Sequence, residues 1–373
     1  MNRGKVIREY IRKGFLIFAN PGSFIVAILF IVSGSAGYIN PSENDLFAVA
    51  GLFYPLLFTG MIITLAISLI LKSKLVYLQL LLLLISIPVS LRYIGFHPNP
   101  DVSGLKIMTY NVHGFKGFEK ETDGKTTYES IISHIEKQNF DIVTLQEFRS
   151  WTGKIENDVK YFAQKAGFEH YHFTGYWRRG GAQSDGYLIL SKLPIINSGT
   201  IPSSTKRNIG SFVDITKEPS QTIRIAGVHL ISFSLGKQEI EAFGDAASLE
   251  MDLLKKHGRS LLGKLRNSFA IRASEVIDLQ NFIKDCDLPL IVGGDFNDTP
   301  ASYTYSKIIE TGMKDTHVQS GFGLGATYGG KLPWLRIDYF FVSKQLSSTH
   351  TAVKSLPYSD HNPVQMQFIS SKY

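Results

Sequence analysis

The sequence predicts an α+β fold for residues 104–373, preceded by three transmembrane helices. Leu, Ile, Val, Phe and Gly dominate residues 23–96, whereas the residues after His97 form an ordinary mixture of polar and apolar types. Short apolar runs rich in β-branched residues then recur along the chain, which is typical of buried strands. Helical patterns lie between several of these runs, so strands and helices alternate irregularly within one large domain.

Three apolar stretches form the predicted membrane part: Ser23–Ile39, Leu46–Leu71 and Leu75–Leu91. A membrane span needs about 20 apolar residues, with a lower limit of about 17. The second stretch is long enough, and Phe15–Ala19 could extend the first. A signal peptide is the alternative reading of the first stretch, but two further spans follow it. We therefore expect residues 1–96 to be an uncleaved anchor, and residues 97–103, with Pro98 and Pro100, to be a short stiff linker.

Basic residues predict how this anchor is oriented. Five Lys or Arg residues precede the first stretch, Lys72 and Lys74 lie between the second and third, and residues 40–45 contain none. Basic loops stay in the cytoplasm. We therefore expect an integral protein of the inner (cytoplasmic) membrane whose C-terminal domain lies outside the cytoplasm.

The net charge of +7 does not indicate a nucleic-acid surface. Residues 1–96 carry eight basic and three acidic side chains, which leaves 31 basic and 29 acidic residues, or +2, for the rest of the chain. A nucleic-acid footprint would need a basic face on the domain itself. The single cysteine, Cys286, excludes an intrachain disulfide and a cysteine-based metal centre, and its apolar neighbours predict a small packing residue.

Predicted strands alternate with predicted helices after residue 104. The strands are Leu105–Tyr110, Ile142–Leu145, Tyr187–Leu190, Ile223–Val228, Leu290–Val292 and Ile337–Val342. The helices are Tyr128–Lys137, Asn157–Gly167, Ser274–Lys284 and Ser302–Glu310. Residues 233–272 are charged and rich in helix formers but contain Gly258 and Gly263, so we expect a helical insertion of two or three short helices there.

Polar side chains follow several of these strands at the point where each is predicted to end. Asn111, Glu147, His229 and Asp295 all occupy such positions. Polar groups at strand ends can converge on one cleft over a rigid scaffold. Asn297 lies two residues after Asp295, so both side chains point to the same side if the segment is extended.

Seven motifs in order resemble the endonuclease/exonuclease/phosphatase superfamily over about Gly104 to Ser370. They are Thr109–Gly114, Leu145–Glu147, Leu190–Ile195, Gly227–Leu230, Gly294–Asp298, Arg336–Tyr339 and Ser359–Val364. The resemblance implies a four-layer α-β-β-α sandwich, with two packed mixed β-sheets flanked by helices, and metal-dependent hydrolysis of phosphate esters. One departure is His113, at a place where several nuclease members have an acid.

The metal implied is Mg²⁺, with Mn²⁺ as an alternative, because such ions prefer oxygen ligands and need only one or two carboxylates. Glu147 is the first expected ligand. Asp360 and Asn111 are expected to contribute as well, directly or through water. His113 puts a second carboxylate contact beside Asn111 in doubt.

Five residues are expected to carry the catalysis. Asp295 suits water activation or proton transfer, and Asn297 could orient the water or contact phosphate. The resemblance implies that Asp338 orients His361, which then faces the phosphate in its protonated form. His229 is expected as a phosphate contact or a general acid.

Some residues allow two interpretations. Arg336 could contact phosphate or pair with an acid, and Tyr328 and Trp334 could line the substrate site or pack in the core. His170 and His172 alternate on a strand-like segment, but no third ligand for zinc is evident.

The sequence leaves the substrate open: a phosphodiester or phosphomonoester, in nucleic acid or in a lipid head group. A non-catalytic binding protein is disfavoured because every principal cleft position keeps a competent residue. No obligate protein partner is inferred.

Overall fold

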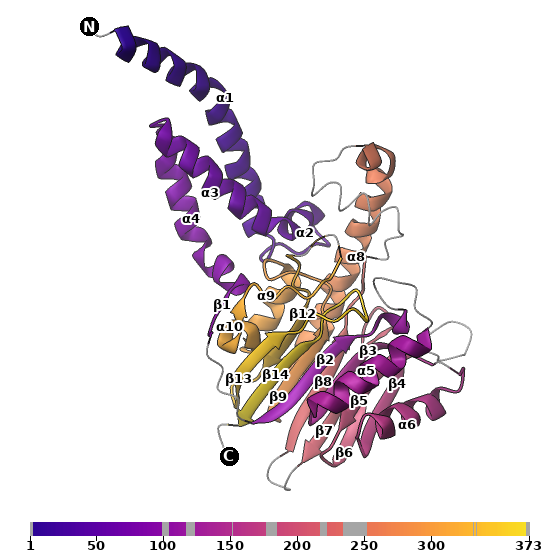
Figure 1. Cartoon of the computed structure of the whole chain (residues 1–373). Helices are drawn as coiled ribbons and strands as arrows, with labels where there is room; N and C mark the ends of the chain where they lie inside the picture. Colours follow the sequence, from indigo (N-terminus) through magenta and orange to yellow (C-terminus); the bar gives the residue numbers. More distant parts are fainter. Residues whose placement is uncertain are drawn as a thin grey trace.

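The computed structural model describes residues 3–98, 104–116, 124–150, 152–176, 185–216, 222–233, 252–330, 332 and 334–370. Long helices from the N-terminal part of the chain project from one end of a body that contains two β-sheets (Figure 1). Most of the expected linker, residues 99–103, lies outside the described residues.

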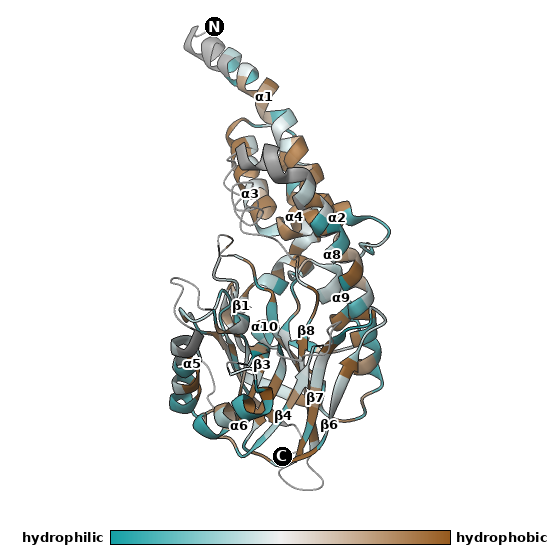
Figure 2. Ribbon diagram, turned by 90° about the vertical axis from the view of Figure 1, so that its right-hand side faces the viewer, coloured by the Kyte–Doolittle hydropathy of each residue, from teal (hydrophilic) through white to brown (hydrophobic). Residues whose placement is uncertain are grey.

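The N-terminal helices are α1 (Arg3–Gly34), α2 (Asp45–Leu52), α3 (Tyr54–Ile70) and α4 (Leu75–Ser90), with the 3₁₀ helix η1 (Leu91–Tyr93) after them. Two segments, Arg12–Gly34 and Leu75–Tyr93, are long and apolar enough to cross a membrane. Figure 2 shows the hydrophobic colour concentrated on α3, in contrast to the mostly hydrophilic α5. A third crossing exists only if α2 and α3 count together as one span.

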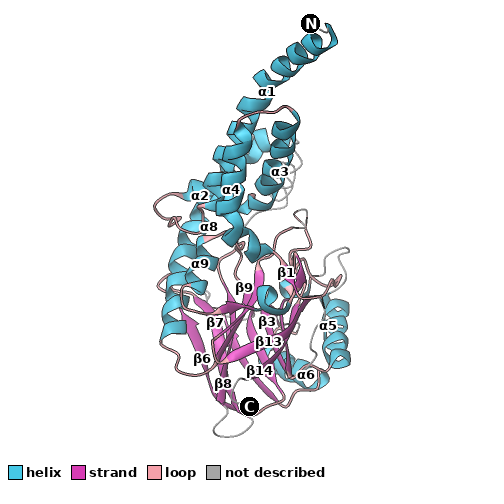
Figure 3. Cartoon of the chain, turned by 90° about the vertical axis from the view of Figure 1, so that its left-hand side faces the viewer, coloured by secondary structure: helices cyan, strands magenta, loops and turns pink. Residues whose placement is uncertain are grey.

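The stretch Leu46–Leu71, expected to form one helix, is instead bent by 70° between α2 and α3. Pro55 lies in the first turn of α3. Proline has no N–H to donate into a preceding turn, so it is tolerated at a helix start and breaks a helix that would run through it. As a result α1, α3 and α4 run beside one another, whereas α2 lies at the end of the sheets (Figures 1 and 3).

Two six-stranded sheets make up the body. One has the order β10-β12-β9-β8-β7-β6 and the other β13-β14-β2-β3-β5-β4. Both are mixed, because β2 is parallel to β3 and β8 is parallel to β9, whereas the other neighbours are antiparallel. The strands are β2 (Leu105–Asn111), β3 (Ile142–Arg149), β4 (His170–Gly175), β5 (Asp185–Ser191), β6 (Ile195–Pro202), β7 (Asn208–Thr216), β8 (Thr222–His229), β9 (Leu290–Asp295), β10 (Lys314–Asp315), β12 (Asp338–Val342), β13 (Leu346–Val353) and β14 (Val364–Ser370).

Three apolar clusters hold the layers together. One, which includes Ile107, Ile225 and Phe340, lies between the two sheets. A second packs α5 (Gly124–Gln138) and α6 (Ile155–Lys165) onto the sheet that contains β3. A third packs α8 (Asp252–Lys284) and α9 (Tyr303–Ile309) onto the sheet that contains β9. Two mixed sheets flanked by helices are therefore present, as the resemblance implied.

The helical part of the insertion differs from its prediction. Residues 252–284 form the single helix α8, although two or three short helices were expected before Ser274; residues 234–251 lie outside the described part. Glycine costs about 1 kcal/mol in a helix interior. Burial of Leu265, Phe269, Ala273 and Val276 along one face of α8 offsets that cost.

A small antiparallel ribbon connects the helices to the body. It pairs β1 (Gly95–Phe96), directly after η1, with β11 (Phe322–Gly323), which follows the short helix α10 (Thr316–Ser320). The chain thus enters the sheet region while still in contact with the end of α4.

Candidate active site

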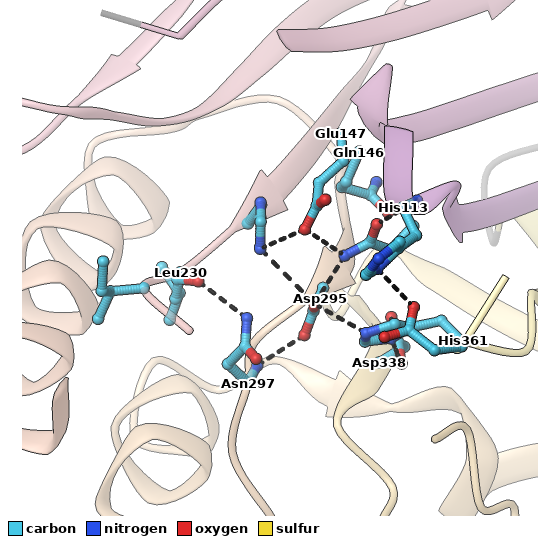
Figure 4. Close-up of polar contacts among 12 residues, drawn as sticks. His113, Gln146, Glu147, Leu230, Asp295, Asn297, Asp338 and His361 are labelled. Atoms are coloured by element: carbon cyan, nitrogen blue, oxygen red, sulfur yellow. Dashed lines mark hydrogen bonds and ion pairs between the residues drawn. The ribbon is translucent and has the colours of Figure 1, made fainter. Parts of the chain in front are cut away.

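The predicted site residues converge at one edge of the two sheets (Figure 4). Register places His229, the last residue of β8, beside Asp295, the last residue of β9, and Asp295 beside Asp338. Asp338 begins β12, and because β12 is antiparallel to β9 its start lies at the same edge. Asn111 ends β2 in the facing sheet. Strand ends therefore bring together groups that are far apart in the sequence.

Asp295 lies at the centre of this arrangement. Its carboxylate accepts hydrogen bonds from the Asn111 amide (3.0 Å) and from the Asn297 backbone N–H (2.8 Å). The Nε2 atoms of His361 and His229 lie 3.6 and 3.7 Å from its Oδ2 atom. Burial raises the pKa of Asp295, against the opposing influence of His361. A buried carboxylate with a raised pKa is a stronger base than an exposed one, which suits proton transfer.

Gly294 allows β9 to approach β8 closely enough for this geometry. Its φ is +150°, and a Cβ atom added there would lie 2.0 Å from the Val228 carbonyl oxygen. A side chain at this position would push the two strands apart. Glycine is thus required at position 294 by the close contact between β8 and β9.

Glu147 reaches the site from a β-bulge. The sequence placed it just after a strand, but β3 continues to Arg149, and the pairing of β3 with β5 is interrupted between Leu145 and Phe148. Glu147 has a φ of +54°, a conformation that side chains other than glycine seldom adopt. Its backbone N–H donates to the Tyr176 hydroxyl (2.9 Å), and its Oε1 atom accepts from the Asn111 amide (3.2 Å). The bulge turns this one carboxylate into the site.

The pKa values of the two site histidines, His361 and His229, are shifted in opposite directions. Burial alone would lower the pKa of His361, but the charges of Asp338 and Asp295 and a hydrogen bond of 2.9 Å between its Nδ1 atom and Asp338 raise it well above the usual value. Burial lowers the pKa of His229. His361 is therefore a cation at neutral pH, and His229 is a neutral imidazole.

The ring of His229 has one committed and one free nitrogen. Its Nδ1 atom lies 3.1 Å from the Tyr176 hydroxyl, which already accepts a hydrogen bond from the Glu147 N–H. The hydroxyl hydrogen is thus available for Nδ1, which leaves the ring proton on Nε2. This buried Nε2 atom has no hydrogen-bond partner among the described residues and lies 3.7 Å from both Glu147 and Asp295. Such an atom indicates a place for a ligand.

His113, the departure from the nuclease pattern, forms an ion pair with Asp360. Its Nδ1 atom lies 2.9 Å from the Asp360 carboxylate, and this hydrogen bond raises the pKa of His113. Burial works against a low pKa of Asp360, but the hydrogen bond from His113 and the charge of His361 outweigh it and lower that pKa. Asp360 is therefore held as an anion beside the site.

The donor set fits a divalent cation that prefers oxygen. Glu147 and Asp360 keep 33% and 23% of their side-chain surface exposed, so solvent reaches both side chains. The Asn111 amide oxygen already accepts the His113 N–H (3.0 Å), and its NH₂ group donates to Glu147. Both the oxygen and the NH₂ group of the Asn111 amide are thus engaged by neighbouring residues.

A second group of possible ligands lies deeper in the site. The ligand atoms of Asp295, Asp338 and His361 are all within 4.8 Å of one another. The Asp338 carboxylate, however, is committed to His361, whose raised pKa keeps a proton on the ring. Glu147 and Asp360 are the more exposed carboxylates, and so the more accessible to a metal ion.

Arg336 and Tyr328, the two residues predicted to contact substrate, lie in different surroundings. Arg336 is 2% exposed, and its guanidinium is bound to Asp315 (2.8 Å) and to the Arg92 carbonyl. This ion pair with Asp315 favours the second interpretation of Arg336, that it pairs with an acid. Tyr328 forms an isolated bridge with His361, and their rings lie 5.8 Å apart. Tyr328 thus lies beside the His361–Asp338 pair, whereas Trp334 packs against an apolar cluster.

Three residues that position others in the site carry no signal in the sequence. Tyr176 holds Glu147 and His229, the Ser359 hydroxyl donates to the Asn111 carbonyl (2.7 Å), and Arg272 donates to the Ile231 carbonyl (2.8 Å). Arginine side chains are usually exposed, whereas Arg272 on α8 is fully buried among apolar residues. Only the tertiary structure reveals such roles.

Comparison with known proteins agrees with this geometry. Residues 108–361 match the Endonuclease/Exonuclease/phosphatase family, and residues 13–93 match a domain of unknown function (DUF8431). None of the curated proteins matches the chain.

Solved structures show the same fold at low sequence identity. An endonuclease/exonuclease/phosphatase from Beutenbergia cavernae is 18% identical with a TM-score of 0.52, covering 71% of each chain. A family protein from Leptotrichia buccalis is 16% identical with a TM-score of 0.51, covering 71% of this chain and 99% of that one. One from Bacteroides vulgatus is 16% identical with a TM-score of 0.51, covering 72% and 100%.

Proposed function

Because the chain belongs to the Endonuclease/Exonuclease/phosphatase family, we propose that it hydrolyses phosphate esters with the help of a bound divalent metal, Mg²⁺ or Mn²⁺. The observation that carries this proposal is the buried Asp295 carboxylate between a cationic and a neutral histidine. Attack of water on a phosphate ester requires a base that takes the proton of the water. It also requires a cation and a hydrogen-bond donor that stabilise the charge on the phosphate oxygens.

Glu147 and Asp360 would hold the metal, and Asn111 would orient Glu147. The metal supplies positive charge that offsets the charge of the phosphate and of the leaving oxygen. Glu147 and Asp360 supply the carboxylate oxygens that Mg²⁺ and Mn²⁺ favour.

The remaining residues handle the proton and the phosphate oxygens. Asp295 accepts the proton of the attacking water, and Asn297 fixes one of its carboxylate oxygens through the backbone. Protonated His361, oriented by Asp338, stabilises charge on the phosphate. His229 donates a hydrogen bond from Nε2 to a phosphate oxygen. Tyr328 lines the substrate side of His361.

We also propose that residues 1–96 form a membrane anchor and residues 104–373 the catalytic domain, outside the cytoplasm. Support comes from the loop between α3 and α4: Ser73 donates to Asn20, and Arg12 contacts the Leu71 carbonyl. Lys72 and Lys74 thus lie at the same end as Arg12. The sheets lie at the opposite end of these helices (Figure 3). With the basic end in the cytoplasm, the site faces the other side.

The experiment is a substrate panel with the full-length protein in lipid nanodiscs. The whole chain is used because the N-terminal helices pack against Ala301, in the loop that follows Asn297 (residues 298–302, called the catalytic loop below). DNA, RNA, a phosphoinositide, sphingomyelin and a generic diester are assayed with Mg²⁺, with Mn²⁺ and with chelator. We expect metal-dependent hydrolysis that Glu147→Ala and Asp295→Asn abolish. Asp285→Asn, an exposed acid outside the site, is the matched control and should behave like the unchanged protein. Full activity in both site variants would disprove the assignment.

A further inference from the structure

The anchor is docked directly on the catalytic loop. The Ala301 N–H donates to the Tyr93 hydroxyl (3.2 Å), and Arg92 donates to the Pro300 carbonyl (3.3 Å). Ala301 lies four residues after Asn297, so the two Cα atoms are at most about 14 Å apart. Tyr93 ends the apolar segment Leu75–Tyr93. The catalytic centre therefore lies close to the end of a candidate membrane span.

Helix α2 and its neighbouring residues also contact the body of the protein. The Thr299 hydroxyl contacts the Gly51 carbonyl (3.5 Å), and Arg266 on α8 pairs with Asp45 (3.1 Å). Ala48 and Leu52 share an apolar cluster with residues of the body that includes Phe269, Leu332, Leu335 and Ile337. The body is therefore fixed to the anchor at several points.

An exposed apolar patch lies beside the end of α4. It consists of Phe96, Phe322 and Leu324, which are 62%, 68% and 55% exposed. Phe96 and Phe322 face each other in the ribbon of β1 and β11, next to the lower end of α4 in Figures 1 and 3. Among the described residues after 104, Phe322 has the most exposed large apolar side chain.

The patch lies just beyond the end of the apolar segment Leu75–Tyr93. Phe96 is three residues beyond Tyr93, at most about 10 Å along the chain. The apolar segment of α4 has 19 residues, or about 28 Å, which matches a hydrocarbon core of about 30 Å. Aromatic side chains collect where this core meets the head groups.

A short segment joins the patch to the catalytic pair. From Leu324 the chain continues to Thr327, whose hydroxyl accepts the Asp338 N–H (3.0 Å), and to Tyr328, which bridges to His361. Leu324 of the patch is thus four residues from Tyr328, which contacts His361.

We infer that Phe96, Phe322 and Leu324 contact the head-group layer of the bilayer that holds α4, and that the site acts on a phosphate ester borne by a lipid of that membrane. This inference rests on the proposed hydrolase function and names its substrate class. The bilayer is the occupant because Phe96 follows the apolar segment Leu75–Tyr93 after two residues, and Phe322 pairs with Phe96. A net charge of +2 on the part of the chain after residue 96 gives nucleic acid no comparable attraction.

Spin labels test the contact surface. Cys286 is the only cysteine, so Cys286→Ser provides a background for labels at Phe322→Cys and, as a control, Ile196→Cys. Ile196 is 60% exposed and lies at the end of its sheet opposite to His229, because neighbouring Ile195 pairs with Ile215 and Ile215 with Ile223. In nanodiscs the label at 322 should collide more with oxygen than with a water-soluble nickel chelate, and the label at 196 should show the reverse. Two equally aqueous labels would overturn the inference.

Turnover tests the substrate class. Full-length protein is placed in vesicles of phosphatidylethanolamine, phosphatidylglycerol and phosphatidic acid, and release of head group or phosphate is compared with cleavage of a soluble diester and of an oligonucleotide. We expect the double change Phe322→Ser with Leu324→Ser to slow lipid turnover by about tenfold and to leave the soluble diester unaffected. Ile196→Ser should change neither rate.

The outcomes separate the two proposals. If the protein cleaves the oligonucleotide or the soluble diester but none of the vesicle lipids, the lipid inference is wrong and the hydrolase function stands. If the double change leaves lipid turnover unaltered, the patch is not a working contact surface. If no ester is cleaved in the presence of metal, the hydrolase function itself fails, while the spin labels still report whether the patch meets the bilayer.

Discussion

Replacing Asp338 by Asn should lower both the activity and the upper pH limit at which the protein works. The Asp338 carboxylate lies 2.9 Å from Nδ1 of His361, and both side chains are buried. Breaking a buried charge pair by removing one partner costs about 3–5 kcal/mol. If that loss falls on the transition state, kcat/KM drops by about 10²- to 10⁴-fold, because each 1.36 kcal/mol is a factor of ten.

The direction of the pH effect follows from the charges around His361. The pKa of His361 is raised, so the protonated form persists to higher pH than usual and is lost only as pH rises through that raised value. In Asp338→Asn the largest source of the rise is gone, and the alkaline limb of the kcat/KM profile should move to lower pH. The assay is the pH dependence of kcat/KM on a soluble diester at saturating metal.

Asp315→Asn is the matched control. Asp315 is also buried and also pairs with a cation, the Arg336 guanidinium at 2.8 Å, but it lies outside the catalytic cluster. This change should lower the melting temperature without moving the alkaline limb. The reasoning would be refuted if Asp338→Asn kept kcat/KM within about threefold and left the limb in place, or if both variants moved it equally.

Three further perturbations separate metal, positioning and structural roles. Metal at 100 times its Kd should stabilise the protein by about 2.7 kcal/mol, and Glu147→Gln should remove most of this gain in a thermal melt with and without chelator; an unchanged gain would place the metal elsewhere. Tyr176→Phe should lower kcat by about tenfold with little change in KM, because the Glu147 N–H and His229 lose their shared partner; a melt checks that the fold survives, and unaltered kcat would contradict the role. Arg336→Lys should destabilise the fold by about 3 kcal/mol in chemical denaturation and leave the KM of the remaining folded enzyme unchanged; a higher KM at equal stability would restore Arg336 as a phosphate contact.

The predictable part of the fold is the part whose strands are apolar on both faces. Each of the six strands expected from apolar runs is present, with ends shifted by a few residues. Strands β6, β7, β13 and β14 were missed because apolar residues alternate with polar ones or glycine there, or because the strand lies at a sheet edge. In Ile195–Pro202 most side chains are at least partly exposed. Composition there resembles a loop, and only pairing with a neighbour makes it a strand.

The site shows the same division between chemistry and geometry. Motif order predicted which residues meet, since strand ends of parallel neighbours share one edge. It could not predict the bulge at Glu147, because a positive φ at a glutamate is imposed by tertiary contacts such as the hydrogen bond to Tyr176. Nor could it choose between the two readings of Arg336, since burial beside Asp315 is a property of packing.

The docking of α2 and α4 on residues 299–301 also has a consequence for how the proposed hydrolase would meet its substrate. A catalytic domain on a free tether explores a volume of solution, whereas this site moves only as its helices move. With those helices in a bilayer, encounters are set by lateral diffusion in two dimensions. For the lipid substrate that we infer, the rate would follow the surface density of that lipid in the bilayer, and dilution of the bulk solution would leave the rate unaffected.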